Sequence, residues 1–165
     1  MTEQKRVVVI GAGIAGLVTA KVLRDDAFDV IVFEREPTIG GVWAATRTYP
    51  GLRTNNSRDT YGYSDHPYDR SADRFPTAEQ VRQYLASYLA RFELGPLIRL
   101  STEVERIEPV RAGLNFVVTV RGPDGLGSVA CDFVVVRRHF LRTRHTRNCW
   151  GTGLCRDGRA FQPGH

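Results

Sequence analysis

The stretch "KRVVVIGAGIAGLVTAKVLRDDAFDVIVFERE" (residues 5–36) decides the fold class of this chain. It opens with the unbroken β-branched run 7–10, which predicts a strand covered on both faces. Apolar residues at roughly helical spacing follow: Leu17, Ala20, Val22 and Leu23. Residues 29–36 predict a second strand that ends on Glu34. Strand, tight turn, helix and strand together form a βαβ unit, so the sequence predicts an α/β domain.

Three glycines between the first strand and the helix fit the pattern G-x-G-x-x-G. We expect Gly11 to permit the tight turn and Gly13 to let the backbone approach a pyrophosphate. Gly16 would let the helix pack close to the strand. This arrangement indicates a Rossmann-like dinucleotide-binding unit. The alternative is a glycine-rich turn that binds nothing.

The residues around these glycines complete the predicted site. Ile14 and Ala15 open the helix, whose N-terminus offers unpaired N–H groups and partial positive charge to phosphates. Glu34 lies 18 residues after Gly16, at the end of the second strand, where it can accept hydrogen bonds from both ribose hydroxyls. Arg35 follows it and belongs to the same candidate set.

Residues 40–76 form a long segment rich in Gly, Pro, Asn, Asp and Tyr, without a regular period. A loop of this length in a compact chain is usually functional or disordered. Its aromatic residues argue against disorder: Trp43, Tyr49, Tyr61, Tyr63 and Tyr68.

The second half of the body predicts one helix and three strands. Residues 77–94 form an amphipathic helix with a capping box of Thr77 and Gln80, and Gly95-Pro96 ends it. Its apolar stripe is Val81, Tyr84, Leu85, Tyr88, Leu89 and Phe92. The strands are expected over 98–107, 114–121 and 128–136, with a hairpin turn at 123–125.

Several blocks of the body resemble one known family. They are GAGIAG (11–16), Glu34, GGVW (40–43), "YPGLRTNNSRDTYGYSDHPY" (49–68), "FPTAEQVRQYLASYLARFEL" (75–94), "STEVERIEP" (101–109) and "CDFVVV" (131–136). The glutamate followed six residues later by Gly-Gly and an aromatic is similar to the FAD side of flavoproteins that bind two dinucleotides. The middle block is the most specific. The sequence resembles flavin-containing monooxygenases and their Baeyer–Villiger relatives.

The resemblance implies a Rossmann-like FAD-binding domain with an inserted helix and an antiparallel β-meander. It adds Gly41, Val42 and Trp43 to the cofactor-binding set, with Trp43 covering the flavin ring or simply filling the core. Val104 matches the position whose backbone pairs with adenine, or is an ordinary strand valine. Asn55 would lie at the reactive edge of the flavin as the catalytic residue, or, with the asparagine after it, would only turn the loop.

The family chemistry uses FAD, NADPH and O₂ to transfer one oxygen atom to a soft nucleophile or a ketone. The cofactor carries this chemistry, and the protein orients it and excludes water. Family members continue to a second glycine-rich domain for NADPH, which this sequence lacks. We therefore expect a truncated FAD-dependent oxidoreductase, incomplete relative to the family. The alternatives are a catalytically inactive FAD- or nucleotide-binding fragment and a product that folds poorly.

The chain changes character after Val136. Residues 137–165 hold seven arginines against one acid, so this segment carries more than the whole net charge of +5 and residues 1–136 carry −1. A nucleic-acid arm lacks the aromatics it would need. A zinc site is a second alternative, but the spacing of its candidate ligands matches no familiar pattern: His139, His145, Cys149 and Cys155. The favoured interpretation is a shifted reading frame. We expect a partial FAD-binding domain over 1–136 and a basic, disordered tail over 137–165.

The remaining composition places the chain in a reducing compartment. Its three cysteines form no CxxC pair, and no apolar run reaches the length of a membrane span. The N-terminal 20 residues also fit a signal peptide, but the glycine spacing and Glu3 argue against that. We expect a cytoplasmic protein with a small-molecule substrate, no resident metal, and neither nucleic acid nor membrane as a partner.

Overall fold

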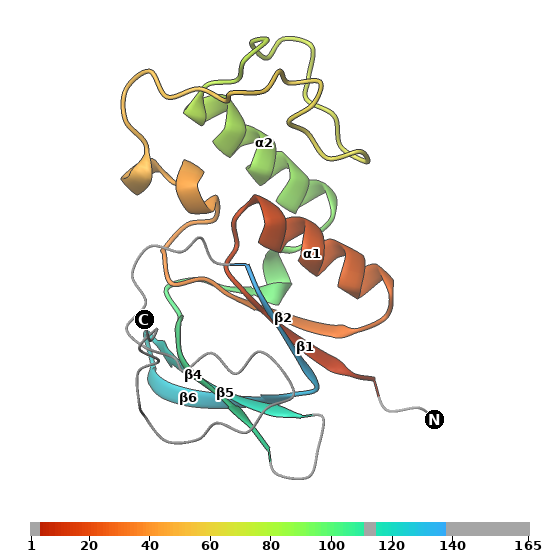
Figure 1. Ribbon diagram of the computed structural model, residues 1–165, viewed down its shortest axis with the longest axis vertical. Helices are drawn as coiled ribbons and strands as arrows, with labels where there is room; N and C mark the ends of the chain where they lie inside the picture. Colours follow the sequence, from red (N-terminus) through yellow and green to blue (C-terminus); the bar gives the residue numbers. More distant parts are fainter. Residues whose placement is uncertain (1–3, 111–114, 138–165) are drawn as a thin grey trace, which may run out of the picture.

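The computed structural model describes residues 4–110 and 115–137, which form three layers (Figure 1). The middle layer is a parallel sheet in the order β3-β2-β1-β7. Two helices, α1 and α2, lie on one side of it, and the antiparallel sheet β4-β5-β6 packs on the other. This is the predicted α/β class with an inserted helix and an antiparallel meander.

In chain order the elements are β1 (Arg6–Ile10), α1 (Ile14–Asp25), β2 (Asp29–Phe33), the short helical turns η1 (Gly41–Trp43) and η2 (Ala45–Arg47), α2 (Ala78–Arg91), the turn η3 (Gly95–Leu97), β3 (Ile98–Arg99), β4 (Glu103–Pro109), β5 (Phe116–Gly122), β6 (Gly125–Cys131) and β7 (Phe133–Val136).

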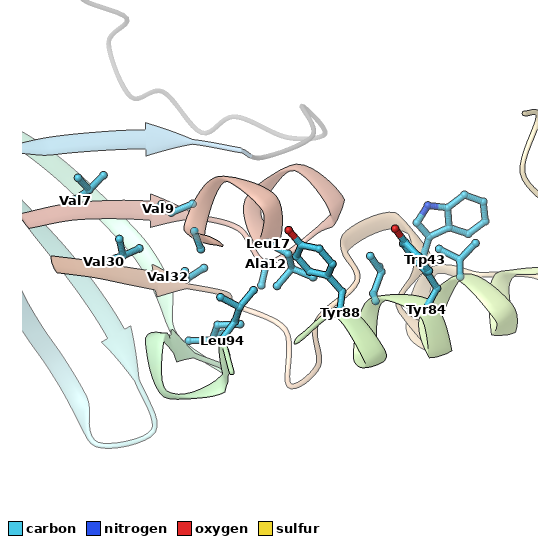
Figure 2. Close-up of a cluster of buried hydrophobic side chains, with 14 of the residues drawn as sticks. Val7, Val9, Ala12, Leu17, Val30, Val32, Trp43, Tyr84, Tyr88 and Leu94 are labelled. Atoms are coloured by element: carbon cyan, nitrogen blue, oxygen red, sulfur yellow. The ribbon is translucent and has the colours of Figure 1, made fainter. Parts of the chain in front are cut away.

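Strand β1 is covered on both faces, as its unbroken apolar run predicts. Val7 and Val9 belong to the core shared with the helices (Figure 2), whereas Val8 belongs to the core shared with the meander. All three side chains are at most 1% exposed. Successive side chains of β1 therefore point to opposite faces of the parallel sheet, and they contribute to a separate hydrophobic core on each face.

Helix α1 forms where the spacing of apolar residues predicts it, and it buries most of those residues. Leu17 and Ala20 are fully buried, and Leu23 packs at the edge of the same core. Val22, the remaining residue of that spacing, is 48% exposed. It is adjacent to Leu23 in sequence, and a step of one residue turns the helix by about 100°, which points Val22 toward solvent.

Helix α2 has the predicted capping box. The Thr77 hydroxyl accepts a hydrogen bond from the Gln80 backbone N–H at 3.2 Å, and the Gln80 side chain accepts one from the Thr77 backbone N–H at 3.0 Å. The apolar stripe of the helix faces α1 and the long loop. Tyr68 stacks on Tyr84 with 3.9 Å between ring centroids. The 40–76 segment is thus held against α2 by aromatic packing, which explains how so long a loop stays ordered.

Two of the three strands expected after α2 are each divided between the two sheets. The expected strand 98–107 breaks into β3 and β4, because Ser101 adopts φ of 51° and donates its backbone N–H to the Glu36 carbonyl at 3.0 Å. The expected strand 128–136 breaks into β6 and β7 at Asp132. The hairpin turn at 123–125 is confirmed, with Gly122 paired to Gly125 across it.

Strand β7 returns to the parallel sheet beside β1. Asp132 makes two hydrogen bonds to the backbone of Arg6. Its N–H donates to the Arg6 carbonyl at 2.9 Å, and its carboxylate accepts from the Arg6 N–H at 2.7 Å. Phe133 and Val136 are 42% and 55% exposed, so the strand is only partly buried, contrary to its apolar pattern. Among the predicted tail residues, Arg137 is described, and the tail predictions for 138–165, including the zinc ligands, lie outside the described residues.

Candidate dinucleotide-binding cleft

A cleft of about 890 Å³ runs along the carboxyl ends of the parallel strands. It lies where β1 has β2 on one side and β7 on the other, which is the topological switch point at which open α/β sheets bind ligands. Its lining residues are Ile10, Gly11, Gly13, Ile14, Ala15, Phe33, Glu34, Arg35, Glu36, Gly40, Gly41, Val42, Trp43, Arg47, Tyr61, Thr102, Glu103, Val104, Val136 and Arg137. Ten of the twelve residues predicted to bind a cofactor are among them; Gly16 and Asn55 are not.

The glycine turn has the geometry that the sequence predicts. Gly11 adopts φ of 102°, which favours glycine, and its N–H donates to the Phe33 carbonyl at 2.8 Å. A Cβ on Gly16 would lie 1.9 Å from the Gly11 carbonyl oxygen, far inside contact distance. Gly16 therefore lies behind the turn rather than in the cleft, and its lack of a side chain is what lets α1 start so close to β1.

The amino end of α1 opens onto the cleft without a side-chain cap. Gly13 is the N-cap, and its carbonyl accepts the first intrahelical bond, from the Leu17 N–H at 3.0 Å. The N–H groups of the first helical turn have no acceptor within the helix, and they carry its partial positive charge. Such an end favours an anion, and Ile14 and Ala15 line the cleft beside it.

A second glycine pair closes against the first. The Gly40 N–H donates to the Ala12 carbonyl at 3.0 Å. A Cβ on Gly41 would lie 3.2 Å from the Gly13 Cα, at a φ of 59° that already disfavours a side chain. The close approach of the two backbones explains why the Gly-Gly step before Val42 and Trp43 is required here. It also holds that segment against Gly13, the residue at which α1 begins.

Glu34 is 7% exposed, and both of its carboxylate oxygens bind backbone. One oxygen accepts from the Ala12 N–H at 2.7 Å, and the other accepts from the Glu36 N–H at 3.0 Å. A carboxylate oxygen has two lone pairs, so each oxygen retains capacity for one more donor. The side chain is thus fixed in place and still able to accept hydrogen bonds from a pair of vicinal hydroxyls.

Two aromatic residues, Trp43 and Tyr61, also line the cleft. Trp43 is 7% exposed and belongs to the helix-side core while also lining the cleft, so the core interpretation is confirmed and the contact with a flavin ring stays a prediction. Its indole N–H donates to the Tyr61 hydroxyl at 2.9 Å, with the two rings edge to face at 5.9 Å. Burial raises the pKa of Tyr61, so its hydroxyl stays protonated at neutral pH.

Other predicted residues differ in how they are placed. Val104 lines the cleft from β4, next to a bulge in its pairing with β5. Arg35 lines the cleft from the end of β2 and lies 3.4 Å from the Glu36 carboxylate. Asn55 is exposed and lies outside the cleft lining, so its catalytic assignment stays a prediction.

Ten of the lining residues were not predicted from the sequence, and Tyr61, Arg47 and Arg137 are the ones among them with side-chain chemistry of interest here. Tyr61 belongs to the aromatic-rich loop, which predicted order but not a position. Arg47 pairs with Glu36 at 2.8 Å at the rim. Arg137 was assigned to the basic tail because it is the first of the seven arginines in residues 137–165. Only the pairing of β7 with β1, which no local pattern indicates, brings Arg137 to the cleft.

A family profile described as "Flavin-binding monooxygenase-like" matches residues 4–121. The chain belongs to this family. Two of its curated relatives are flavin-containing monooxygenases FMO GS-OX-like 6 and FMO GS-OX1 of Arabidopsis thaliana. They are 36% and 35% identical over alignments that cover 86% and 82% of this chain, but only 36% and 35% of the relatives.

Solved structures of monooxygenases share the fold of this flavin-binding monooxygenase-like chain. S-allyl-L-cysteine S-oxygenase from Allium sativum superposes with a TM-score of 0.73 at 31% identity, covering 81% of this chain and 36% of the other. A steroid monooxygenase bound to NADP superposes with a TM-score of 0.73 at 32% identity, covering 88% and 28%. The chain therefore spans about a third of the length of the relatives it matches.

Within residues 4–110 and 115–137, neither helix is long and apolar enough to cross a membrane. The same part of the chain contains no cluster of three or more metal-ligating side chains. Cys131 is a free, buried thiol there, and burial raises its pKa. The cleft is the feature of the described residues that best matches the chemistry of the family.

Proposed function

We propose that this chain forms the FAD-binding portion of an NADPH-dependent flavin monooxygenase. The single observation that carries the proposal is that one cleft brings together the Glu34 carboxylate, the α1 N-terminus and the Trp43–Tyr61 pair. A dinucleotide has one part suited to each of the three: a ribose with its base, a diphosphate, and a second ring. The first two parts fit residues on either side of the glycine turn.

The residues that would hold FAD fall into three groups. Glu34 would accept hydrogen bonds from the ribose hydroxyls, with Val104 beside the adenine. The N–H groups at Ile14 and Ala15, together with the bare backbone of Gly13, would face the diphosphate. Gly41, Val42 and Trp43 would border the flavin. When bound, this cofactor supplies the redox chemistry, and the chain orients it and excludes water from its buried side.

Family membership supports the rest of the reaction. NADPH would be the electron donor and O₂ the oxidant, with one oxygen atom passed to a small organic substrate by N- or S-oxygenation or by Baeyer–Villiger chemistry. We keep Asn55 as the candidate catalytic residue on the motif alone. The cysteine pattern supports a cytoplasmic location.

A second candidate is an FAD- or nucleotide-binding module without oxygenase activity. It is favoured by one observation: the residues suited to the adenosine and the diphosphate line one cleft, whereas Asn55, the candidate catalytic residue, lies outside its lining. In that case the chain would bind FAD and would not consume NADPH.

One experiment tests both candidates. The purified chain is mixed with excess FAD, freed of unbound flavin, and examined for flavin absorbance, then assayed for substrate-stimulated NADPH oxidation. Retained FAD with NADPH oxidation supports the monooxygenase, and retained FAD alone supports the silent module. A folded chain that retains no FAD contradicts both. Glu34→Gln is the matched variant, because it removes a predicted ribose contact from a side chain of the same size.

A further inference from the structure

Arg137 lies at the switch point of the parallel sheet. Its backbone N–H donates to the Ile10 carbonyl at 2.9 Å, which extends the β1–β7 pairing by one residue beyond Val136. Ile10 directly precedes Gly11, so Arg137 emerges beside the first glycine of the turn. Ligands of open α/β sheets bind just outside the carboxyl ends of the two strands that flank such a point.

The charges that line the cleft single out this arginine. Arg47 is bound to Glu36 at 2.8 Å, and Arg35 lies 3.4 Å from the same carboxylate. Arg137 is exposed, lines the cleft, and has no carboxylate in ion-pair contact among residues 4–110 and 115–137. Within that part of the chain its charge is therefore available to a ligand.

The neighbouring backbone favours the same kind of ligand. The α1 N-terminus, whose first-turn N–H groups have no side-chain cap, opens onto the cleft that Arg137 lines from β7. A helix end and a guanidinium in one cleft both stabilise negative charge, and a guanidinium matches phosphate oxygens with paired N–H donors. The binding group expected between them is a diphosphate.

We infer that Arg137 is a diphosphate-binding residue of the cleft, contributed by the segment after β7. This inference rests on the proposed function and deepens it, because it adds a cation from outside the glycine turn to the dinucleotide site. Arg137 would contact the phosphates from the β7 side while α1 contacts them from the other. It would act on the diphosphate and not on the adenosine.

The test compares ligands that contain and lack phosphate. Calorimetric titration of the full chain with FAD, ADP and adenosine is done at low and high ionic strength. Arg137→Gln is expected to weaken FAD and ADP binding about three- to fivefold at low salt and to leave adenosine binding unchanged. The difference should vanish near 1 M salt, where the screening length falls to about 3 Å. Arg137→Lys, which keeps the charge, should retain most of the affinity.

Arg121→Gln is the matched control, because Arg121 is an exposed arginine paired with Glu105 on the meander, 2.5 Å away. It removes the same charge and should leave all three affinities unchanged. An Arg137→Gln chain that binds ADP as tightly as the wild type at low salt would overturn this inference alone. Equal losses for ADP and adenosine would overturn it as well. A wild-type chain that binds neither FAD nor ADP overturns the proposed function, and this inference with it.

Discussion

The Glu34 carboxylate accepts a hydrogen bond of 2.7 Å from the backbone N–H of Ala12, the residue between the first two glycines of the turn. The end of β2 is thereby tied to the loop that follows β1. The same side chain supports the glycine turn and presents acceptor oxygens to the cleft. Stability and ligand binding should therefore fall together when this side chain is changed.

Glu34→Gln should destabilise the chain by about 1–3 kcal/mol, because an amide has one acceptor oxygen and both carboxylate oxygens bind backbone N–H groups. FAD affinity should fall about tenfold or more. Urea unfolding and flavin titration measure the two effects. Glu105→Gln, at an exposed ion pair on the meander, is the control and should cost less than about 1 kcal/mol. Equal losses in the two variants would contradict the prediction.

Gly16→Ala should be among the most damaging small substitutions. The added methyl would lie 1.9 Å from the Gly11 carbonyl oxygen, which is backbone and cannot rotate away. We expect a loss of at least about 3 kcal/mol, at the upper end of overpacking effects, measured by thermal and urea unfolding. Gly127→Ala is the control, because its Cβ would meet the Val120 side chain at an ordinary 3.8 Å. A Gly16→Ala chain as stable as the control would show that α1 can shift away from β1.

Tyr61→Phe should cost about 1–2 kcal/mol, because it leaves the buried indole N–H of Trp43 without its acceptor. Tyr68→Phe offers a matched comparison. The Tyr68 hydroxyl is buried and has no hydrogen-bond partner among the described residues, so its removal should be neutral or slightly stabilising. The free energy of unfolding of the two variants measures the difference. Equal effects would mean that the Trp43–Tyr61 bond contributes nothing.

Acid should destabilise the chain through His66. The Ser87 hydroxyl donates to the Tyr84 carbonyl at 2.8 Å, so it accepts from His66 Nε2–H, and the neutral ring leaves Nδ1 without a proton. Nδ1 is buried and lacks a partner among the described residues, and burial together with nearby Arg91 lowers the pKa of His66 despite the opposing effect of Asp65. The unfolded state therefore binds the proton more tightly.

The free energy of unfolding should consequently decrease as the pH falls from about 7 through the ordinary histidine pKa of about 6.5 toward 5. Unfolding curves over this window for the wild type and His66→Gln test the effect. The variant should show a flatter dependence on pH, since it removes the group whose protonation opposes folding. A wild type and variant with parallel pH dependences would exclude His66 as the cause.

Most of the fold is encoded locally enough to be predicted. The run at 7–10 specifies a strand with two buried faces, and the capping box of Thr77 and Gln80 specifies where α2 begins. The breaks at Ser101 and Asp132 are different, because they arise from bonds to distant backbone. Ser101 takes a positive φ while its N–H binds the Glu36 carbonyl, and Asp132 pairs with Arg6. Serine and aspartate are common in turns, but a single such residue does not show where a strand divides between two sheets.

The cleft divides in the same way. Gly11, Gly13 and Glu34 follow from motif spacing, because each has a backbone task that only its residue type performs. Tyr61 and Arg137 reach the cleft through packing and strand pairing between segments far apart in sequence. Asn55, assigned from the motif, lies outside the lining, so its role stays a prediction from the motif alone.

The pairing of β1 with β7 joins residues 126 positions apart in the chain, as the Arg6–Asp132 bonds show. During synthesis β1 leaves the ribosome long before β7 is made. The edge of β1 that pairs with β7 therefore stays unpaired until nearly the whole described sequence has been synthesised. Pairings of such long range slow folding and leave unpaired strand edges exposed to aggregation. A nascent chain interrupted before residue 133 would therefore hold the glycine turn without the strand that braces it. We expect such a chain to depend on chaperones far more than its small size suggests.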